Sequence, residues 1–363
     1  GHFFFDTLLF LERKKTRKYH ENYKLNLIIP FIDIYLHQSN KYLLKFWKKF
    51  FYIDTTGFTK YLYLTNNLFF KNKNLNITIR PYDYDDSLKN FNPRINFTSD
   101  ELKKGEDYFN KVGIGKNDKF VCLLLRDPRY FKETYPNRDY SYQDYRNVNL
   151  KNYKDACKFL TSKNIFVIRM GKFVEEEFSI NDEKVIDYAS SKFRSDFLDI
   201  FISSKCFFWI TVGSGIDASS YIFQKPVLYT NRAPLGYTMG NKFSLSIMKH
   251  YYDIESKKKL SLSQISNNSL LTDVNTKILN DKKINLIENT SSEILESTKE
   301  IYYSLNNTFE FKDNRLKANN KINKLINYNN NTFFDIHDQP IQNFKNYPFF
   351  SYNFLKNNNY LLK

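Results

Sequence analysis

Two arginines and a glycine turn are the groups in this sequence best suited to chemistry on a phosphate. Arg126 and Arg169 each directly follow an apolar run, and Gly213, Ser214 and Gly215 directly follow another. Free backbone N–H groups at the start of a helix attract anions, and the guanidinium fork of arginine matches two phosphate oxygens. These residue types in these positions indicate a site for a diphosphate.

For these groups to meet, the apolar runs must be neighbouring parallel strands. The runs span Lys119–Leu125, Ile165–Ile168 and Cys206–Val212, and helical patterns lie between them. Strands that alternate with helices predict an α/β fold, with a parallel sheet covered on both faces. Because ligands bind beyond the carboxyl ends of such strands, we expect the arginines and the glycine turn at one edge of the sheet.

The same residues also have purely structural interpretations. A glycine turn suits any tight connection between a strand and a helix. Either arginine could pair with Asp127 or Asp196 and only brace the loops, but the ligand role is favoured because both arginines directly follow apolar strands. Asp217, just inside the helix after the glycine turn, could accept hydrogen bonds from ribose or sugar hydroxyls, or complement the helix dipole.

The candidate general base is His2. It follows Gly1 at the head of a helical pattern, Phe3–Arg13. In a two-domain enzyme that loop would face the cleft between the domains, where a histidine accepts a proton near neutral pH. The alternative is an ordinary polar loop residue. The other histidines lack a partner motif and are expected at surface or packing positions: His20, His37, His250 and His337.

Composition and charge bound the class of protein. The 363 residues suggest about two domains, and 42% hydrophobic residues are ample for a core. The net charge of +16 favours anionic partners such as nucleotide diphosphates or lipid headgroups, although coding bias towards Asn, Lys and Ile can also raise it. The sequence contains no nucleic-acid-binding motif, so nucleic acid is not an expected partner.

The cysteines and apolar segments suggest a cytoplasmic protein without a metal. Cys122, Cys157 and Cys206 lie in apolar patterns typical of buried thiols in a reducing compartment, and no Cys/His cluster has metal-ligand spacing. No signal peptide is evident, and no apolar run approaches the roughly 20 residues that span a bilayer. The basic aromatic segment Tyr42–Tyr52 could rest on the inner face of a membrane, but a helix packed on a sheet is favoured.

A polar stretch divides the chain into domains. Residues 1–96 are expected to form an N-terminal Rossmann-like domain, which is partial because a strand could be missing before Gly1. Residues 97–308 are expected to form a C-terminal Rossmann-like domain that binds a nucleotide. Residues 309–363, rich in Asn and aromatic residues, are expected to form a tail that either packs across both domains or stays mobile.

The pattern of these residues resembles a family of bacterial glycosyltransferases of the GT-B group. The resemblance covers nearly the whole chain, including Gly1-His2, and is best over 121–231. The matching segments are Arg126-Asp127-x-x-Tyr130, Tyr145-Arg146-Asn147, Arg169-Met170-Gly171, Ser195-Asp196-Phe197-x-Asp199, Gly213-Ser214-Gly215, Lys225-Pro226 and Asn289-x-x-x-Glu293.

The resemblance implies two Rossmann-like domains whose parallel sheets face each other across a cleft. It assigns the donor diphosphate to Arg126, Arg169, Gly213, Ser214 and Gly215, the donor sugar or ribose to Asp217 and Asn231, the cleft lining to Asp127, Tyr130 and Arg146, and the acceptor side to His2. The sequence departs from the GT-B pattern in its missing first strand. It also lacks the usual glutamate of the donor site, for which Asp217 is a stand-in.

The expected reaction is transfer of a sugar from a nucleotide diphosphate sugar to a hydroxyl of a cell-surface glycan or lipid-linked acceptor. We expect it to be inverting and independent of metal ions and cofactors, because arginines can offset the leaving charge. One alternative is a nucleotide-sugar epimerase or a pyruvyl transferase on the same scaffold. An epimerase needs two acid/base groups across the sugar, and the sequence has few candidates. Another alternative is a noncatalytic protein that binds a glycan or a nucleotide.

Overall fold

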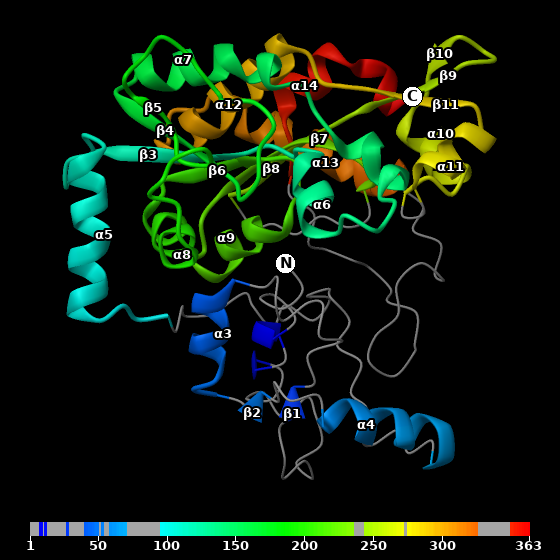
Figure 1. Ribbon diagram of the computed structural model, residues 1–363. Coiled ribbons are helices and arrows are strands. Elements are labelled where there is room, and N and C mark those ends of the chain that lie inside the picture. The colour runs from blue at the N-terminus through cyan, green and yellow to red at the C-terminus, as the bar shows by residue number, and fades with distance from the viewer. Residues whose placement is uncertain are drawn as a thin grey trace.

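A seven-stranded parallel sheet forms the centre of the protein, which is therefore α/β as expected (Figure 1). The computed structural model describes residues 7–9, 11–12, 27–28, 40–50, 52–53, 58–70, 95–235, 243–271, 274–325 and 349–363. Across the sheet the order is β12-β8-β7-β6-β3-β4-β5. The strands are β3 (Lys119–Leu124), β4 (Ile165–Met170), β5 (Val185–Asp187), β6 (Phe208–Thr211), β7 (Val227–Arg232), β8 (Leu245–Met248) and β12 (Phe349–Phe350).

The strand order places a topological switch point between β3 and β6. The chain runs from β3 outwards through β4 to β5, returns to the other side of β3 as β6, and continues through β7 to β8. This is the order of a doubly wound, Rossmann-like sheet, in which ligands bind at the carboxyl ends of the two central strands. Leu124 is paired with Thr211 across these strands, so the segments that follow them start side by side.

The sheet is buried on both faces, which explains why its strands read as continuous apolar runs. Val121 and Leu123 of β3 belong to the core shared with α7 (Lys154–Ser162) and α12 (Ser291–Leu305). Phe120 and Cys122 belong to a second core, shared with α5 (Ser99–Lys111) and α8 (Asp196–Lys205). In Figure 1, α7 and α12 lie above the sheet and α8 lies below it.

Helices α5 and α8 approach each other closely at a glycine. A capping box of Thr98 and Glu101 starts α5. Gly105 lies in the middle of this helix, and a Cβ atom there would lie 2.1 Å from Cε1 of Phe201 in α8. Only a residue without a side chain therefore fits at this position while Phe201 keeps its place in the core.

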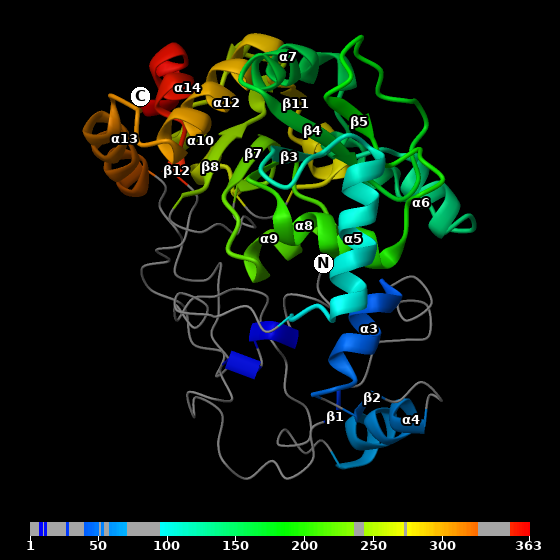
Figure 2. The same cartoon turned by 90° about the vertical axis from the view of Figure 1, so that its left-hand side faces the viewer.

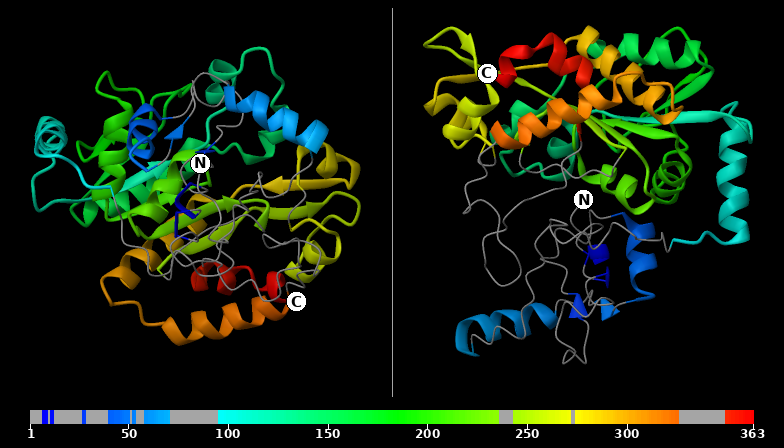
Figure 3. Two further views of the ribbon diagram at one scale, coloured as in Figure 1. Left: turned by 90° about the horizontal axis from the view of Figure 1, so that it is seen from below. Right: turned by 180° about the vertical axis from the view of Figure 1, so that it is seen from behind.

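A small antiparallel lobe follows β8 and was not expected from the sequence. Its strands are β9 (His250–Asp253), β10 (Lys258–Lys259) and β11 (Ile284–Ile287), with β9 at the centre. Two short helices, α10 (Leu262–Asn267) and α11 (Thr276–Asp281), belong to the same lobe. Figure 3 shows the lobe beside one end of the large sheet.

The described part of the C-terminal segment packs on the large sheet. It consists of α13 (Lys312–Leu325), β12, α14 (Tyr352–Asn357) and a 3-10 turn at Asn359–Leu362. Strand β12 pairs with β8 in parallel, and α14 packs against α12. The buried Glu300 of α12 accepts hydrogen bonds from Ser351 Oγ at 2.7 Å and from the Tyr352 backbone N–H at 3.0 Å. These residues complete the C-terminal domain and are not shown to bridge two domains.

The C-terminal turn is also anchored by a buried histidine. His250 is 2% exposed, and its Nε2 lies 3.0 Å from Glu293 Oε1 while its Nδ1 lies 2.5 Å from the Tyr360 hydroxyl. Burial opposes ionisation of Glu293, but the hydrogen bond and charge of His250 prevail and lower its pKa to about 2. Glu293 therefore stabilises the fold as an anion.

We expect this anion to contribute to stability in acid. Since the folded pKa of Glu293 is about 2 and the usual value is 4.5, its contribution is full above pH 4.5 and is lost as the pH falls towards 2. Glu293→Gln keeps a capping-box residue but removes the charge, so unfolding in urea should show a loss of about 2 kcal/mol near neutral pH that shrinks below pH 4.5. An equal loss at every pH would contradict this. Glu296→Gln, on the same helix, is the control.

The N-terminal part contacts the large domain through α3 (Lys41–Trp47) (Figure 2). The Asn40 side chain donates to the Asp196 carbonyl oxygen and the Lys41 backbone N–H donates to Asp196 Oδ2, both at 2.8 Å. The helix packs against α8 rather than on the sheet that the sequence favours as its neighbour. Three of its apolar side chains are buried: Leu43, Phe46 and Trp47. This helix is shorter than expected because Tyr52 already belongs to a strand.

The remaining N-terminal elements are short. Strand β1 (Leu27–Ile28) pairs in parallel with β2 (Tyr52–Ile53), and α4 (Phe58–Thr65) continues into a π-helical turn at Asn66–Phe70. Thr7–Leu9 and Leu11–Glu12 are helical, inside the helix expected for this segment. Among the described helices, none combines the length and the hydropathy needed to cross a bilayer.

Candidate functional site

The switch point between β3 and β6 brings Arg126 and the glycine turn together. Gly213 has a φ of +80°, a region that favours glycine, and Gly215 opens a 3-10 turn, Gly215–Asp217. The helix that follows, α9 (Ala218–Ile222), has five residues. The expected strand, glycine turn and helix are therefore present, but a helix this short adds little dipole. Attraction for an anion at this edge has to come mainly from side chains.

Two arginines meet at this edge and share one glutamine. Arg146 comes from a 3-10 turn, Ser141–Arg146, and its Nη2 donates to the Gly213 carbonyl oxygen at 2.6 Å. Gln143 Oε1 accepts from Arg126 Nη2 at 2.8 Å and from Arg146 Nη1 at 3.4 Å. Burial, followed by the positive charge of Arg146, lowers the pKa of Arg126 to about 10. The two guanidinium groups are close enough to repel each other.

A buried lysine adds a third positive charge. Lys249 directly follows β8, is 3% exposed, and donates from Nζ to the Asn147 carbonyl oxygen at 2.9 Å. Burial lowers its pKa to about 8; Glu288 opposes this change and the charge of Arg126 supports it. We call Arg126, Arg146 and Lys249 the cation cluster.

The cation cluster is incompletely neutralised. Within the described part of the chain, none of its three members forms an ion pair with a carboxylate; their hydrogen bonds go to a glutamine and to backbone carbonyls. Asp144, in the same turn as Arg146, accepts a hydrogen bond from Asn147 Nδ2 at 3.1 Å, and its charge offsets only part of the effect of burial and of Arg146 on Arg126. An anion bound between the three cations would relieve their mutual repulsion and form charge-assisted hydrogen bonds.

Arg169 does not join the cation cluster. It is 1% exposed, and its Nη1 donates to the Glu176 carbonyl oxygen at 2.5 Å and to Asp187 Oδ2 at 3.1 Å. Its Nη2 lies 3.8 Å from Asp127 Oδ2. Arg169 therefore pairs with carboxylates, as in the alternative in which it only braces the loops. Asp187 is a closer partner than Asp127.

Asp127 and Tyr130, two of the expected cleft-lining residues, lie near the same edge of the sheet, and their contacts hold the loop that follows β3. Asp127 accepts hydrogen bonds from the Arg129 and Glu175 backbone N–H groups, at 2.9 and 2.8 Å. Tyr130 is half-buried and packs against the rings of Phe131 and Phe173. Burial raises the pKa of Tyr130, so its hydroxyl stays neutral.

The residues assigned to the donor sugar or ribose are engaged within the fold. Asp217 is 7% exposed, and its Oδ2 accepts from the Ser214 backbone N–H at 2.8 Å and from Thr211 Oγ1 at 3.1 Å. Burial raises its pKa to about 6. Asn231 is buried and exchanges two backbone-to-side-chain hydrogen bonds with Asn289, at 2.6 and 2.7 Å. These contacts favour the structural alternative for Asp217. Both residues therefore stabilise the loops at this edge of the sheet.

Two further expectations concern a base and a metal. His2 lies outside the described residues, so its role as general base stays a prediction. In the described ranges, no group of three His, Cys, Asp or Glu side chains is placed to hold a metal ion. All three cysteines are buried, as expected from their apolar neighbours.

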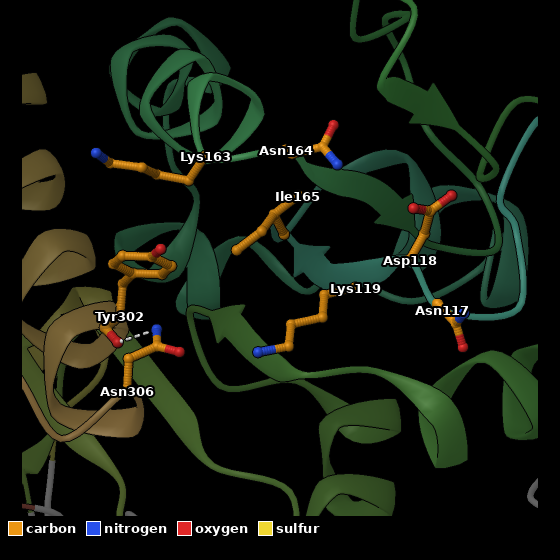
Figure 4. Close-up of a pocket in the computed structure, with 8 residues that line it drawn as sticks. All are labelled: Asn117, Asp118, Lys119, Lys163, Asn164, Ile165, Tyr302 and Asn306. Carbon is orange, nitrogen blue, oxygen red and sulfur yellow. Dashed lines mark hydrogen bonds between the residues drawn. The ribbon is translucent and has the colours of Figure 1, made fainter.

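A polar pocket of about 260 Å³ lies at the other edge of the sheet (Figure 4). Lys119 and Ile165, the first residues of β3 and β4, contribute to its wall, so it opens at the amino ends of the strands. Ligands of doubly wound sheets bind at the carboxyl ends instead. The pocket is therefore not the candidate site. Its remaining lining residues are Asn117, Asp118, Lys163, Asn164, Tyr302 and Asn306.

Sequence reasoning missed Lys249 and Gln143. Lys249 carries the same signal as Arg126, since it directly follows an apolar strand, Leu245–Met248. Gln143 lies in a tyrosine-rich loop whose fold no local pattern predicts. Comparison with known proteins adds no assignment, because no protein-family model, curated protein or solved structure matches the chain. The function must be argued from the site.

Proposed function

We propose that the cation cluster binds the diphosphate of a nucleotide sugar and that the protein is a glycosyltransferase. The observation that carries the proposal is the position of the cluster. Arg126 and Arg146 meet at the switch point of a doubly wound sheet, where such folds bind nucleotides, and Lys249 adds a third charge from the end of β8. Within the described chain, none of the three forms an ion pair with a carboxylate. The choice of sugar transfer rests on the sequence resemblance.

In the proposed reaction, an acceptor hydroxyl attacks the anomeric carbon of the donor sugar. The bond from that carbon to the diphosphate oxygen breaks, and the nucleotide diphosphate leaves with the electron pair. Arg126 and Arg146 offset the charge that develops on the leaving oxygen. The hydroxyl proton passes to a base, for which His2 is the proposed residue. Attack opposite the leaving group inverts the anomeric centre.

The acceptor side belongs to the N-terminal part in this proposal. The parallel pair β1–β2 and the contact of α3 with Asp196 are compatible with a second Rossmann-like domain beside the first. A GT-B arrangement would place the glycan or lipid-linked acceptor between the two. Contact of this part with a membrane surface stays a prediction.

Thermal unfolding with a panel of nucleoside diphosphates tests the proposed donor site. A ligand at about 100 times its dissociation constant should stabilise the protein by about 2.7 kcal/mol. We expect one or more nucleotides to raise the midpoint, and Gly213→Val to abolish the effect, because a branched side chain is strained at a φ of +80° and would distort the glycine turn. Lys119→Ala, at the opposite edge, is the control and should respond like the wild type.

Product analysis separates sugar transfer from the alternatives. Incubation of the bound nucleotide sugar with and without hydroxyl acceptors should give a glycosylated product only when an acceptor is present. Conversion of the donor without an acceptor would favour an epimerase. Binding without turnover over a broad acceptor panel would identify a noncatalytic binding protein. No stabilisation by any nucleotide would contradict the donor site itself.

A further inference from the structure

A column of aromatic rings extends from the cation cluster to the protein surface. The guanidinium of Arg126 lies 4.9 Å from the ring centroid of Phe131. Phe131 stacks on Tyr140 with centroids 4.4 Å apart and planes 11° apart, and Tyr140 stacks on Tyr142 at 5.9 Å and 29°. Tyr142, at the outer end, is 46% exposed. Within the described chain, Tyr140 is the one aromatic ring that contacts Tyr142.

The column is held in place relative to the cations. Gln143 Nε2 donates to the Tyr142 hydroxyl at 3.0 Å, while its Oε1 accepts from both arginines. The 3-10 turn that carries these residues is anchored from the antiparallel lobe, where Thr276 Oγ1 donates to the Ser141 carbonyl oxygen at 2.9 Å. Tyr142 is thus a rigid, exposed aromatic group, and its position is tied to the proposed phosphate site.

The separation of this ring from the cations suits a nucleotide. From Arg126 Nη2 to the Tyr142 hydroxyl the path crosses one amide group and two hydrogen bonds, of 2.8 and 3.0 Å. One side chain, Gln143, thus contacts both groups, so we expect a ribose to be able to join a base on the ring to a phosphate on the arginine. Bases stack on aromatic side chains with a gain of about 1–3 kcal/mol each, and an exposed tyrosine next to a phosphate site supplies such a platform.

We propose that Tyr142 stacks on the nucleobase of the nucleotide whose phosphates the cation cluster binds. This inference rests on the proposed function, since it assumes a nucleotide at the cluster. It adds a subsite that the sequence did not indicate and identifies its ligand as a flat heteroaromatic ring. Stacking tolerates different bases, so selection among them belongs to other contacts.

Calorimetric titration with two probes tests this inference. The probes are inorganic pyrophosphate, which has no base, and the nucleoside diphosphate that stabilises the wild type most. Tyr142→Ala should weaken binding of the nucleoside diphosphate about 5- to 150-fold, the equivalent of about 1–3 kcal/mol, and leave pyrophosphate binding within about two-fold. Tyr142→Phe keeps the ring and should bind both probes nearly as the wild type does. Tyr61→Ala, at another exposed tyrosine, is the matched control.

The remaining outcomes would overturn the inference in distinguishable ways. Unchanged nucleoside diphosphate binding by Tyr142→Ala rejects the stacking role but leaves the phosphate site intact. Equal losses for both probes, also in Tyr142→Phe, would mean that Tyr142 acts by positioning Gln143. If neither probe binds the wild type, the proposed function fails together with this inference.

Discussion

Replacing Arg146 by Ala is expected to lower turnover by about 10²- to 10³-fold, the range found when one donor to a developing negative charge is removed. The side chain has two roles here, because it carries charge next to Arg126 and ties its loop to the Gly213 carbonyl oxygen at 2.6 Å. Arg146→Lys keeps the charge but lacks the fork that reaches both Gly213 and Gln143, so an intermediate loss is expected.

The measurements are the dissociation constant of the nucleoside diphosphate and the rate of sugar transfer. The charge of Arg146 lowers the pKa of Arg126. We therefore expect the Arg146→Ala variant to fold and the pKa of Arg126 to rise in it. Arg129→Ala is the matched control: Arg129 begins α6 (Arg129–Thr134), which also lies between β3 and α7, but its half-exposed guanidinium pairs with Glu133 at 3.1 Å. Wild-type binding and turnover in a folded Arg146→Ala variant would remove this residue from the site.

Replacing Gly105 by Ala is expected to destabilise the protein by about 3 kcal/mol. In an exposed helix this change stabilises by about 1 kcal/mol, because Ala has the higher helix propensity. At Gly105 the steric effect prevails, since the new methyl would lie 2.1 Å from a ring carbon of Phe201, which is 1% exposed and packed in the core. Overpacking of a core typically costs about 1–3 kcal/mol, and this overlap is severe.

A double-mutant cycle identifies the cause. Phe201→Ala alone should cost about 3–5 kcal/mol because it leaves a cavity. With Phe201→Ala present, Gly105→Ala should become nearly neutral, so the double variant should be more stable than the sum of the single effects predicts. Unfolding in denaturant gives all three free energies. Glu106→Ala, exposed on the same helix, should change stability by less than about 0.5 kcal/mol; additive effects of the first two changes would contradict the close approach.

The central strands could be predicted because a parallel sheet buries both of its faces. Strand β3 is buried from Phe120 to Leu124, so it appears in the sequence as one apolar run. A second local signal is the capping box, a Ser or Thr followed three residues later by Glu or Gln, which begins α5 at Thr98 and α12 at Thr290. Both signals are local, so they can be recognised in the sequence without any knowledge of the tertiary structure.

The edge of the sheet and the antiparallel lobe could not be predicted in the same way. Strand β12 consists of Phe349–Phe350, and it is a strand because it pairs with Leu245 and Ser246 of β8, about 100 residues earlier. Two residues contain no periodicity. Strand β10, Lys258–Lys259, is likewise defined by its pairing with β9. Such elements depend on long-range contacts that a local pattern cannot report.

At the site, two residues of strand length explain why Arg169 and Arg126 lie in different surroundings. Arg126 lies beyond the end of β3, where a side chain can reach a ligand. Arg169 was placed after a strand ending at Ile168, but β4 continues to Met170, and Arg169 is paired with Leu123 inside the sheet. A cation in that position is buried and needs the carboxylate of Asp187. Boundaries of this kind are the least certain feature of a sequence pattern.

The pairing of β12 with β8 has a consequence for synthesis on the ribosome. Strands β3 to β8 emerge first and can assemble while the chain is still growing, since domains generally fold from the N-terminal side during translation. Until residues 349–363 follow, however, β8 is an open edge, and unpaired edges are templates for aggregation. The nascent protein therefore passes through a vulnerable interval of about 100 residues, which a chaperone that shields strand edges would cover.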